Sequence, residues 1–594
     1  MPTLADAPAA SLLAAQPPTP LDKLPQLQAG WGDFYEKLES RLNSLRTWRY
    51  SWWAFWGVLA AFFIPRRYIW LVVANRMWRG SALNDQIINS TGVLAVRTCA
   101  AGMWTGLTSP SRPWFKQGVM GVQSTDLDED GREWLEDSDH RMYTVLAGSN
   151  FYSQMAQVFQ DEVVFGTAPL ITYEDFEDVV RFYLPCAGEY YLANGARLNN
   201  DSFYREFTYT TAQIVGRWTL EKCPPAVQTA WDTKGASLDQ EFVIAHAIEP
   251  NTSLLVEGKV KWLAPRLFPW REVYWLRGQK ENPLEVKGFH SEPFAVFRAY
   301  LCANDAYGRS FCMDAIGDNK QIQLQDRRKA EYITKGVRPS MGADVELKNN
   351  PYSTIPDGVT FVSTEGGKKG FFPLYEINPQ WLPGLTVDIQ QVAARVEKAL
   401  FVDLFMAISR MEGVQPRNEL ELTKRDLERL QELGPVITLA EEALSKILTR
   451  VRDIMERRGL LKPRPASLRG AALDIKYHSI LRLAQRAAQS VAMKDTFQTA
   501  GALSSAAKAA GVPDPIRVLD LDKAMREYGD INNFPADCIF TDDEVRAHDK
   551  IRQQEMQKAQ MPQQASAAVQ AAKTLSETSL PGGNSALGAM LGQQ

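Results

Sequence analysis

The feature that most constrains this chain is a helix–insertion–helix pattern between Tyr307 and Pro435. From Leu385 to Arg410, apolar residues recur at steps of three and four, which predicts an amphipathic helix of about 39 Å at about 1.5 Å per residue. The stripe consists of Ile389, Val392, Val396, Ala399, Leu400, Leu404, Phe405 and Ile408. A more charged helix is expected from Met313 to Lys335. Two long helices around an insertion suggest a pillar that carries a tip.

The insertion, residues 337–383, is rich in Gly and Pro and contains two short apolar runs, VTFVS and FFPLYEI. These runs predict two or three strands joined by turns. Lys368 and Lys369 occupy a Gly-flanked turn. They would form either a solvated hairpin tip or a contact with phosphate.

A polar segment, RMEGVQPRNE, follows the second predicted helix, and Gly413 and Pro416 within it break helical structure. A charged helix is expected next, and Gly434 with Pro435 marks a kink or a new helix start. The helix that follows should end near Arg458, because Gly459 suits a C-terminal cap.

The N-terminal part contains one stretch that imitates a membrane span, from Trp52 to Val73. Pro65, Arg66 and Arg67 interrupt it, so neither apolar part reaches the roughly 20 residues that a span needs. The stretch is expected to be a buried helix and turn. The alternative is a peripheral aromatic anchor.

Other segments indicate a mixed fold. Ser81 to Met103 is expected to be a helix that ends at Gly102, whereas runs between Phe242 and Ala306 are rich in β-branched and aromatic residues. The order lacks the regular strand–helix alternation of a doubly wound sheet. The fold class predicted is therefore α+β and predominantly helical.

Bulk composition excludes several functions. A formal net charge of −4 does not suit a non-specific nucleic-acid binder, although it permits DNA handled locally. The six cysteines contain no CxxC pair, so a disulfide-rich or zinc-binding protein is not expected, and buried free thiols are. There is no P-loop, no GxGxxG and no HExxH, so no cofactor is predicted.

Two motifs need weighing against simpler interpretations. Asp126 to Asp137 spaces its carboxylates like an EF-hand loop, but an acidic helix start explains them better and no metal site is predicted. GRSFC, Gly308 to Cys312, resembles the GxSxG nucleophile elbow, but Cys312 replaces the second glycine. A hydrolase centred on Ser310 is therefore only a minor alternative, and no catalytic residue is predicted.

Several ordered segments together resemble the portal, or head-to-tail connector, proteins of short-tailed, podovirus-type bacteriophages. They are LNDQIINSTGVLAVRTCAAGMWTGLTSPSRPWF from Leu83, SNFY from Ser149, FGTAPL from Phe165, YGRS from Tyr307 and VLDLDKAMREYGDINNFPADCIFTDDEVRAHDKIR from Val518. The family usually has Pro after YGRS, where this chain has Phe311.

The resemblance implies a portal-type subunit with named regions. These would be an N-terminal arm at 1–27, a wing at 28–306, stem helices at 307–336 and 385–409, a clip at 337–384, a tunnel loop at 410–419, further wing helices at 420–460, a crown at 461–550 and a flexible C-terminal tail at 551–594. Arg410, Met411, Glu412 and Arg417 would belong to the tunnel loop, and Lys368 and Lys369 to the tip of the clip.

The resemblance further implies a non-enzymatic ring of about twelve identical subunits at one capsid vertex. Double-stranded DNA would be packaged, retained and ejected through it. Expected partners are the terminase motor, tail adaptor proteins, and the major capsid and scaffolding proteins. The protein would occur in the virion, and in the host cytoplasm during assembly. The competing hypothesis is a membrane-associated scaffold that uses residues 52–73, whereas the portal hypothesis expects no stable membrane insertion.

Overall fold

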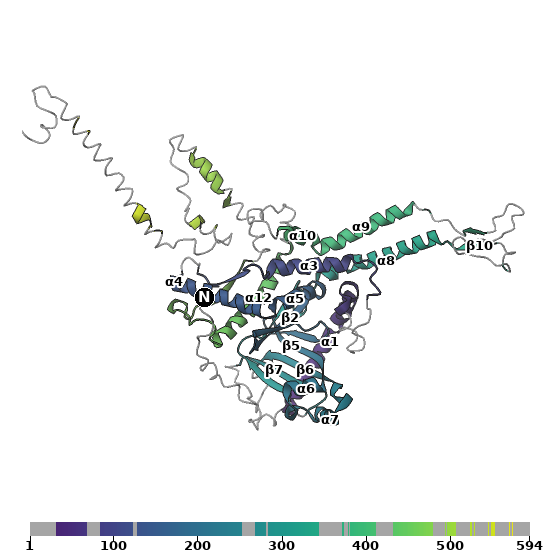
Figure 1. The fold of residues 1–594 in the computed structure, drawn as a ribbon, viewed down its shortest axis with the longest axis horizontal. Helices are drawn as coiled ribbons and strands as arrows, with labels where there is room; N and C mark the ends of the chain where they lie inside the picture. Colours follow the sequence, from purple (N-terminus) through teal and green to yellow (C-terminus); the bar gives the residue numbers. More distant parts are fainter. Residues whose placement is uncertain are drawn as a thin grey trace, which may run out of the picture. The chain divides into compact units, whose positions relative to one another are not determined.

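The computed structural model describes residues 31–67, 84–122, 127–251, 268–280, 283–343, 371–373, 380–411, 432–478 and 496–505, and short pieces at 348, 378, 493–494, 523–525, 528, 545, 548–552, 570 and 573. The chain divides into two compact units. The first comprises Met1–Lys116, Asp137–Pro463 and Tyr477–Gln485, and the second Gln117–Glu136, Arg464–Lys476 and Arg486–Gln594. The predicted α+β class is confirmed, because long helices accompany antiparallel sheets (Figure 1).

Two antiparallel sheets form the centre of the first unit (Figure 1). The larger has the order β4-β5-β6-β7-β8, built from Tyr190–Asn194, Asn200–Thr210, Glu241–Pro250, Trp270–Leu276 and Glu285–Phe289. The smaller has the order β3-β2-β9, from Val179–Tyr183, Thr167–Asp175 and Phe294–Arg298. The β-like character expected between Phe242 and Ala306 is thus confirmed.

Helix α1 (Trp31–Phe63) packs its N-terminal half on the five-stranded sheet. Its apolar residues there recur at helical spacing and meet alternate residues of the strands. The helical side of this core consists of Trp31, Phe34, Tyr35, Leu38, Leu42 and Leu45. The remaining face of the sheet meets a helical segment between β5 and β6, made of α6 (Thr211–Trp218) and α7 (Pro225–Thr233).

The C-terminal half of α1 explains the aromatic stretch that imitated a membrane span. Trp56 is fully buried, its indole Nε1–H donates to the Phe165 carbonyl over 3.1 Å, and its ring contacts Tyr190 and Tyr307. The expected buried helix is therefore confirmed as far as Phe63, whereas residues 68–73 lie outside the described part. No helix of that part is long and apolar enough to cross a membrane.

Helix α3 (Thr91–Leu107) corrects the helix expected from Ser81 to Met103. The backbone N–H groups of Ile88 and Asn89 donate to the side chain of Gln323 at 2.7 and 2.8 Å, so they are held by α8 (Phe311–Val337) and not by a preceding helical turn. The helix then continues past Gly102 to Leu107. Gly102 therefore lies inside α3. Its missing side chain leaves room for the ring of Phe405, which belongs to a second helix.

Helices α5 (Phe151–Phe165) and α12 (Gly434–Arg457) flank the three-stranded sheet. Arg450 of α12 is buried, and it donates from Nε to the Thr172 carbonyl and from Nη1 to the Ser291 carbonyl at 2.8 and 2.9 Å. Pro435 lies in the first turn of α12, as expected for a helix restart, and Gly459 follows its end with φ +68°.

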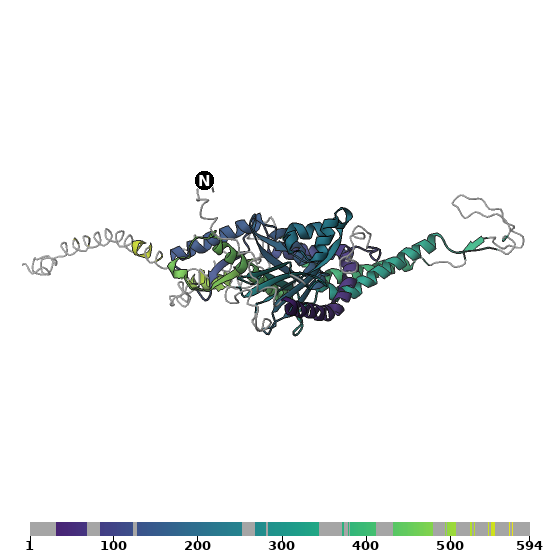
Figure 2. The same ribbon diagram turned by 90° about the horizontal axis from the view of Figure 1, so that it is seen from below.

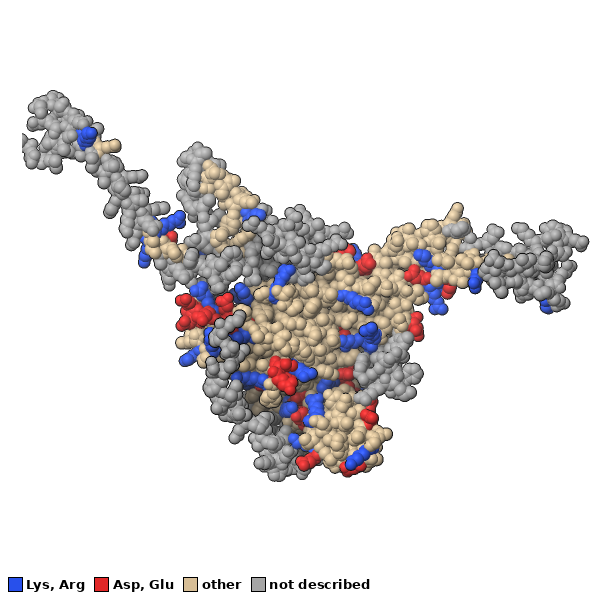
Figure 3. Space-filling view, viewed as in Figure 1, with Lys and Arg blue, Asp and Glu red and all other residues tan. Residues whose placement is uncertain are grey.

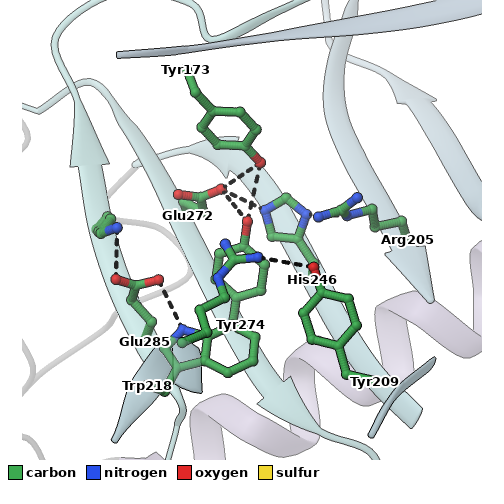
Figure 4. A network of polar contacts seen from close by, with 10 residues as sticks. Tyr173, Arg205, Tyr209, Trp218, His246, Glu272, Tyr274 and Glu285 are labelled. Carbon is green, nitrogen blue, oxygen red and sulfur yellow. Dashed lines mark hydrogen bonds and ion pairs between the residues drawn. The ribbon is translucent and has the colours of Figure 1, made fainter. Parts of the chain in front are cut away.

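A buried polar network joins the two sheets (Figure 4). His246 accepts a hydrogen bond at Nδ1 from Arg205 Nε at 2.9 Å, so its proton is assigned to Nε2, which donates to Glu272 at 2.8 Å. The hydroxyls of Tyr173 and Tyr274 donate to the same carboxylate at 3.1 and 2.9 Å. Burial lowers the pKa of His246 to about 4. Because Tyr173 belongs to β2 and the other four residues to the larger sheet, this network fixes the two sheets to each other.

The second unit holds most of the short sheet formed by β1 (Phe115–Val119) and β12 (Leu473–Tyr477). Its core comprises Val119, Trp134, Leu135 and Leu468. Residues 117–136, assigned to the wing from sequence, thus pack with residues 464–476 from the start of the expected crown.

Helix α4 (Glu129–Gly148) decides between the two interpretations of the acidic segment. Glu129 and Asp130 lie in its first turn, where carboxylates favour the positive end of the helix. Asp137, the last position of the supposed EF-hand loop, lies within the helix and pairs with Arg141 at 2.9 Å. The acidic helix start is confirmed, since a helix occupies most of the segment that an EF-hand needs as a loop.

Candidate functional site

The expected pillar is present as an antiparallel pair of helices (Figure 1). Helix α8 (Phe311–Val337) leads out from the sheets and α9 (Trp381–Ala399) returns beside it, and both views show the pair extending away from the sheets (Figure 2). At the far end, β10 (Met341–Ala343) pairs with β11 (Phe371–Pro373), with Gly342 opposite Phe372. We call α8, α9, β10 and β11 the hairpin.

Polar contacts connect the two helices of the hairpin along their length. Asp318 of α8 and Arg395 of α9 form an ion pair of 3.1 Å, and Gln325 donates to the carboxylate of Asp388. Both residues of the ion pair are partly exposed, so the pair contributes little stability by itself. The apolar stripe on α9 supplies the packing, with Ile389, Val392 and Val396 buried.

The base of the hairpin is anchored where two sequence blocks meet, FGTAPL and YGRS. The N–H of Gly308 donates to Thr167 Oγ1 at 2.8 Å. Ser310, fully buried, donates from Oγ to the Val164 carbonyl at 2.8 Å and accepts from the Met313 N–H at 3.1 Å. Ser310 is therefore the N-cap of α8. Its hydroxyl is committed to two structural hydrogen bonds and is not available as a nucleophile.

The second long helix expected from Leu385 to Arg410 is not one straight rod. Helix α9 ends at Ala399, Phe401 adopts φ +54°, and α10 (Val402–Met411) continues in a new direction. The bend lets Phe405 reach α3, where a Cβ built on Gly102 would lie 2.2 Å from the Phe405 ring. Six residues of the stripe are buried, namely Ile389, Val392, Val396, Leu400, Leu404 and Phe405, and they pack in two directions.

The sequence-predicted site residues are only partly described. Arg410 and Met411 form the end of α10, whereas Glu412, Arg417, Lys368 and Lys369 lie outside the described residues. Within the described ranges, no three His, Cys, Asp or Glu side chains gather as a metal site would need. Of the cysteines described, Cys99, Cys186, Cys223 and Cys312 are buried free thiols as expected, but Cys302 is exposed.

The outer half of the hairpin exposes large apolar side chains, which the sequence analysis did not single out. Four lie close to the ends of the helices and at β10, with exposed fractions of 75% for Val337, 74% for Trp381, 45% for Met341 and 43% for Ile333. We call these four residues the apolar collar. Clustered apolar exposure of this kind is typical of a protein–protein contact. Val337 and Trp381 could not be identified from sequence, because periodicity does not tell a covered face from an uncovered one.

Comparison with known proteins gives the family. The model of the family described as "Bacteriophage head to tail connecting protein" matches residues 35–540. The chain belongs to this family.

Two relatives extend the match. The chain is 32% identical over 552 residues to the "Portal protein" of Salmonella phage epsilon15, covering 91% of this chain and 95% of that protein. It is 32% identical over 545 residues to the "Probable portal protein" of Bordetella phage BPP-1, covering 90% and 94%. The suspected kinship with portal proteins of short-tailed phages is confirmed.

Similar solved structures include "Virion of native gene transfer agent (GTA) particle" and "Neck of empty GTA particle computed with C6 symmetry". Their TM-scores are 0.31 and 0.29, at 12% identity, and each match covers 72% of this chain and 91% of the other. TM-scores of this size are too low to establish a shared fold.

The predicted function, a portal subunit that builds a ring at the junction of head and tail, is confirmed by family membership over the membrane-scaffold alternative. The role is structural, and the protein is a component of the virion.

Proposed function

We propose that about twelve copies of this chain close into a ring in which the hairpins stand side by side as staves of a channel wall. Double-stranded DNA passes through this channel during packaging, is retained there and is ejected through it. The observation that carries the proposal is the apolar collar. Its four side chains remain in water in a single subunit, and a neighbouring hairpin would cover them.

The physical argument rests on the type of interface that closes a ring. A heterologous contact joins two different surfaces of identical subunits, so each subunit offers one surface to each neighbour. Burying Trp381 and Val337 against such a neighbour removes apolar area from water at about 25 cal/mol per Å². The extended hairpin gives the contact the length that a wall needs.

Further partners belong to the same proposal. The terminase motor and then tail adaptor proteins would dock at the end of the hairpin that carries β10 and β11, with Lys368 and Lys369 at the clip tip. Major capsid and scaffolding proteins would contact the remaining surface during assembly in the host cytoplasm. The protein would catalyse no reaction, which the structural role of Ser310 supports.

The segment after α10 is proposed as the tunnel loop, with Arg410, Met411, Glu412 and Arg417 beside the passing DNA. Its support is position, since it follows the helix that bends at Phe401 away from the axis of α9. Deleting residues 412–418 should leave ring assembly intact and impair DNA packaging or retention. Loss of the ring itself would show that the segment is part of the subunit contact.

The experiment that tests the ring is negative-stain imaging of purified protein with collar variants. Val337→Asp and Trp381→Asp should give folded subunits that no longer close into rings, because each buries a charge in the contact. Phe176→Asp is the matched control, since Phe176 is 94% exposed at the β2–β3 turn, away from the collar. Unchanged rings from both collar variants would refute the contact, and absence of rings in the unmodified protein would refute the assembly.

A further inference from the structure

One face of α8 is basic over most of its length. Residues 320, 324, 327, 331, 335 and 338 follow one another at steps of three or four, and residue 328 lies four after 324 and three before 331, so these positions share a face. Arg338 is the C-cap that follows the end of α8. We call this set the basic face. It holds Lys320, Arg327, Arg328, Lys335 and Arg338, together with Leu324 and a single carboxylate, Glu331.

These cations are accessible to solvent, and the Lys320 ammonium also lies over the Phe62 ring, 5.6 Å from its centroid. All five are exposed, and the side chains of Arg327 and Arg328 are 70% and 67% exposed. Arg327 and Arg328 both pair with Glu331, at 3.5 and 2.8 Å, so one carboxylate serves two guanidinium groups. In Figure 3, several blue side chains lie along the edge of the hairpin that α8 forms. Among the described residues, Glu331 therefore neutralises this face only in part.

The other side of the same helix has opposite chemistry. Asp326, Ala330, Ile333 and Val337 also follow at steps of four and three, and Ile333 and Val337 belong to the apolar collar. Asp326 accepts from Asn89 Nδ2 at 2.6 Å, which turns this side towards the start of α3. One helix thus carries an apolar surface suited to protein and a basic surface suited to a polyanion.

We infer that the basic face of α8 contacts the phosphate backbone of double-stranded DNA in the channel. This rests on the proposed DNA conduit and adds the residues that touch the DNA. From 320 to 338 the helix rises about 27 Å, along which a parallel duplex carries about 16 phosphates. Long, exposed Lys and Arg side chains form weak, salt-screened contacts that carry no sequence information, so the duplex is held and still slides.

The contacts should slow the sliding of the duplex without stopping it. Glu331 shares its charge with two of the five cations, which tempers the attraction at the middle of the face. Lys320, Lys335 and Arg338 have no carboxylate partner among the described residues. They should therefore contribute most of the electrostatic attraction to the DNA phosphates. The triple variant Lys320→Gln, Lys335→Gln and Arg338→Gln therefore removes the strongest part of the contact without touching the Glu331 pairs.

The test is the affinity of assembled rings for a labelled 30-base-pair duplex, measured across a salt series (the duplex is about two helical turns longer than the basic face). The triple variant should bind about tenfold more weakly at 0.1 M salt, and the slope of log K against log salt should shrink by at least about 1. The control replaces Lys37, Arg197 and Lys222 by Gln, which removes the same charge from exposed positions outside the hairpin.

A second measurement reports position directly. In a chain with Cys302→Ser and Cys538→Ser, an iron–EDTA group is tethered to Leu324→Cys, on the basic face, or to Leu198→Cys, between β4 and β5 and outside the hairpin. Both positions are 56% exposed and neither belongs to the apolar collar. Duplex held in the ring should be cleaved from Leu324→Cys and spared from Leu198→Cys.

Each outcome separates the two proposals. Equal binding by the unmodified ring and the triple variant, or equal cleavage from both tethers, overturns the basic-face contact and leaves the DNA channel standing. Rings of unmodified protein that take up no duplex overturn the channel and the contact together. A triple variant that binds duplex normally but yields particles with failed assembly would assign the basic face to an acidic protein surface, and that also overturns the inference.

Discussion

Gly166 and Gly308 approach each other so closely that a Cβ built on either would lie 2.4 Å from the other's carbonyl oxygen. Gly166 ends α5 with φ +74°, and Gly308 lies two residues before the N-cap of α8. The crossing point of two backbones therefore sets where the hairpin leaves the sheets. Only glycine fits at either position, because backbone atoms cannot move aside as a flexible side chain can.

Gly308→Ala should destabilise the subunit by about 2 to 4 kcal/mol, because the added methyl group forces two backbones apart at the base of α8. The measurement is the urea midpoint of purified subunits. Gly317→Ala is the matched control on the same helix, since its Cβ would meet nothing within 4 Å. That change should stabilise by about 0.5 to 1 kcal/mol through helix propensity. Equal midpoints for Gly308→Ala and the unmodified chain would contradict the close approach.

Gly102 and Phe405 should be energetically coupled. Gly102→Ala alone places a methyl group against the Phe405 ring and should cost about 1 to 3 kcal/mol. Phe405→Leu alone leaves a small cavity at a side chain that is 1% exposed. The double variant should recover about 1 kcal/mol relative to the sum of the single changes, measured by denaturant unfolding of all four proteins. Strict additivity would mean that α10 does not pack on α3 at this point.

The polar network between the sheets should make the first unit sensitive to acid. The pKa of His246 is about 4 because burial disfavours its charged form, whereas an unfolded histidine titrates near 6.5. Between these values the unfolded chain binds a proton that the folded chain does not, so stability falls as pH decreases from about 6.5 to about 4.

His246→Gln should flatten that dependence, since a Gln side chain offers an acceptor to Arg205 and a donor to Glu272 but does not titrate. The change between pH 7 and pH 5 should shrink by about 1 to 2 kcal/mol, read from urea midpoints. Buried carboxyl groups such as Glu162 also titrate in this window, but both proteins contain them, so the difference between the two pH profiles reports the histidine. Identical pH profiles for the two proteins would rule out His246 as the group responsible.

Glu162 should give the opposite pH dependence. It is fully buried, neither carboxyl oxygen has a hydrogen-bond partner among the described residues, and burial raises its pKa to about 8. The folded chain therefore keeps a proton that the unfolded chain loses above about 4.5, so this group's contribution to stability is lost as pH rises from about 4.5 through 8.

Glu162→Gln, which is uncharged at every pH, should raise stability at pH 8.5 by on the order of 3 kcal/mol and change little at pH 5. Asp161→Asn is the contrasting variant. The Asp161 carboxylate pairs with Arg67 at 2.9 Å, so removing its charge should destabilise the fold. A Glu162→Gln protein that is no more stable at pH 8.5 would show that the carboxyl finds a partner or water.

The second stem helix shows which part of the site the sequence predicts. The spacing of Ile389, Val392, Val396, Leu400 and Leu404 identified the buried stripe correctly. It did not reveal the bend, because a stripe with steps of three and four is the same whether the helix runs straight or turns at Phe401. The bend depends on Gly102, which is distant in sequence and supplies the space that Phe405 fills.

The sequence by itself determined the helix–insertion–helix pattern, the α+β class, the burial of the aromatic stretch around Trp56 and the membership of the portal family. These follow from local periodicity, length and ordered motifs, all of which are written along one segment at a time. The tertiary structure alone decided that Gly166 meets Gly308, that Ser310 caps a helix, that His246 is neutral, and which faces of α8 are basic or apolar and uncovered. Each of these depends on which distant residues exclude water from a group, and no local pattern records that.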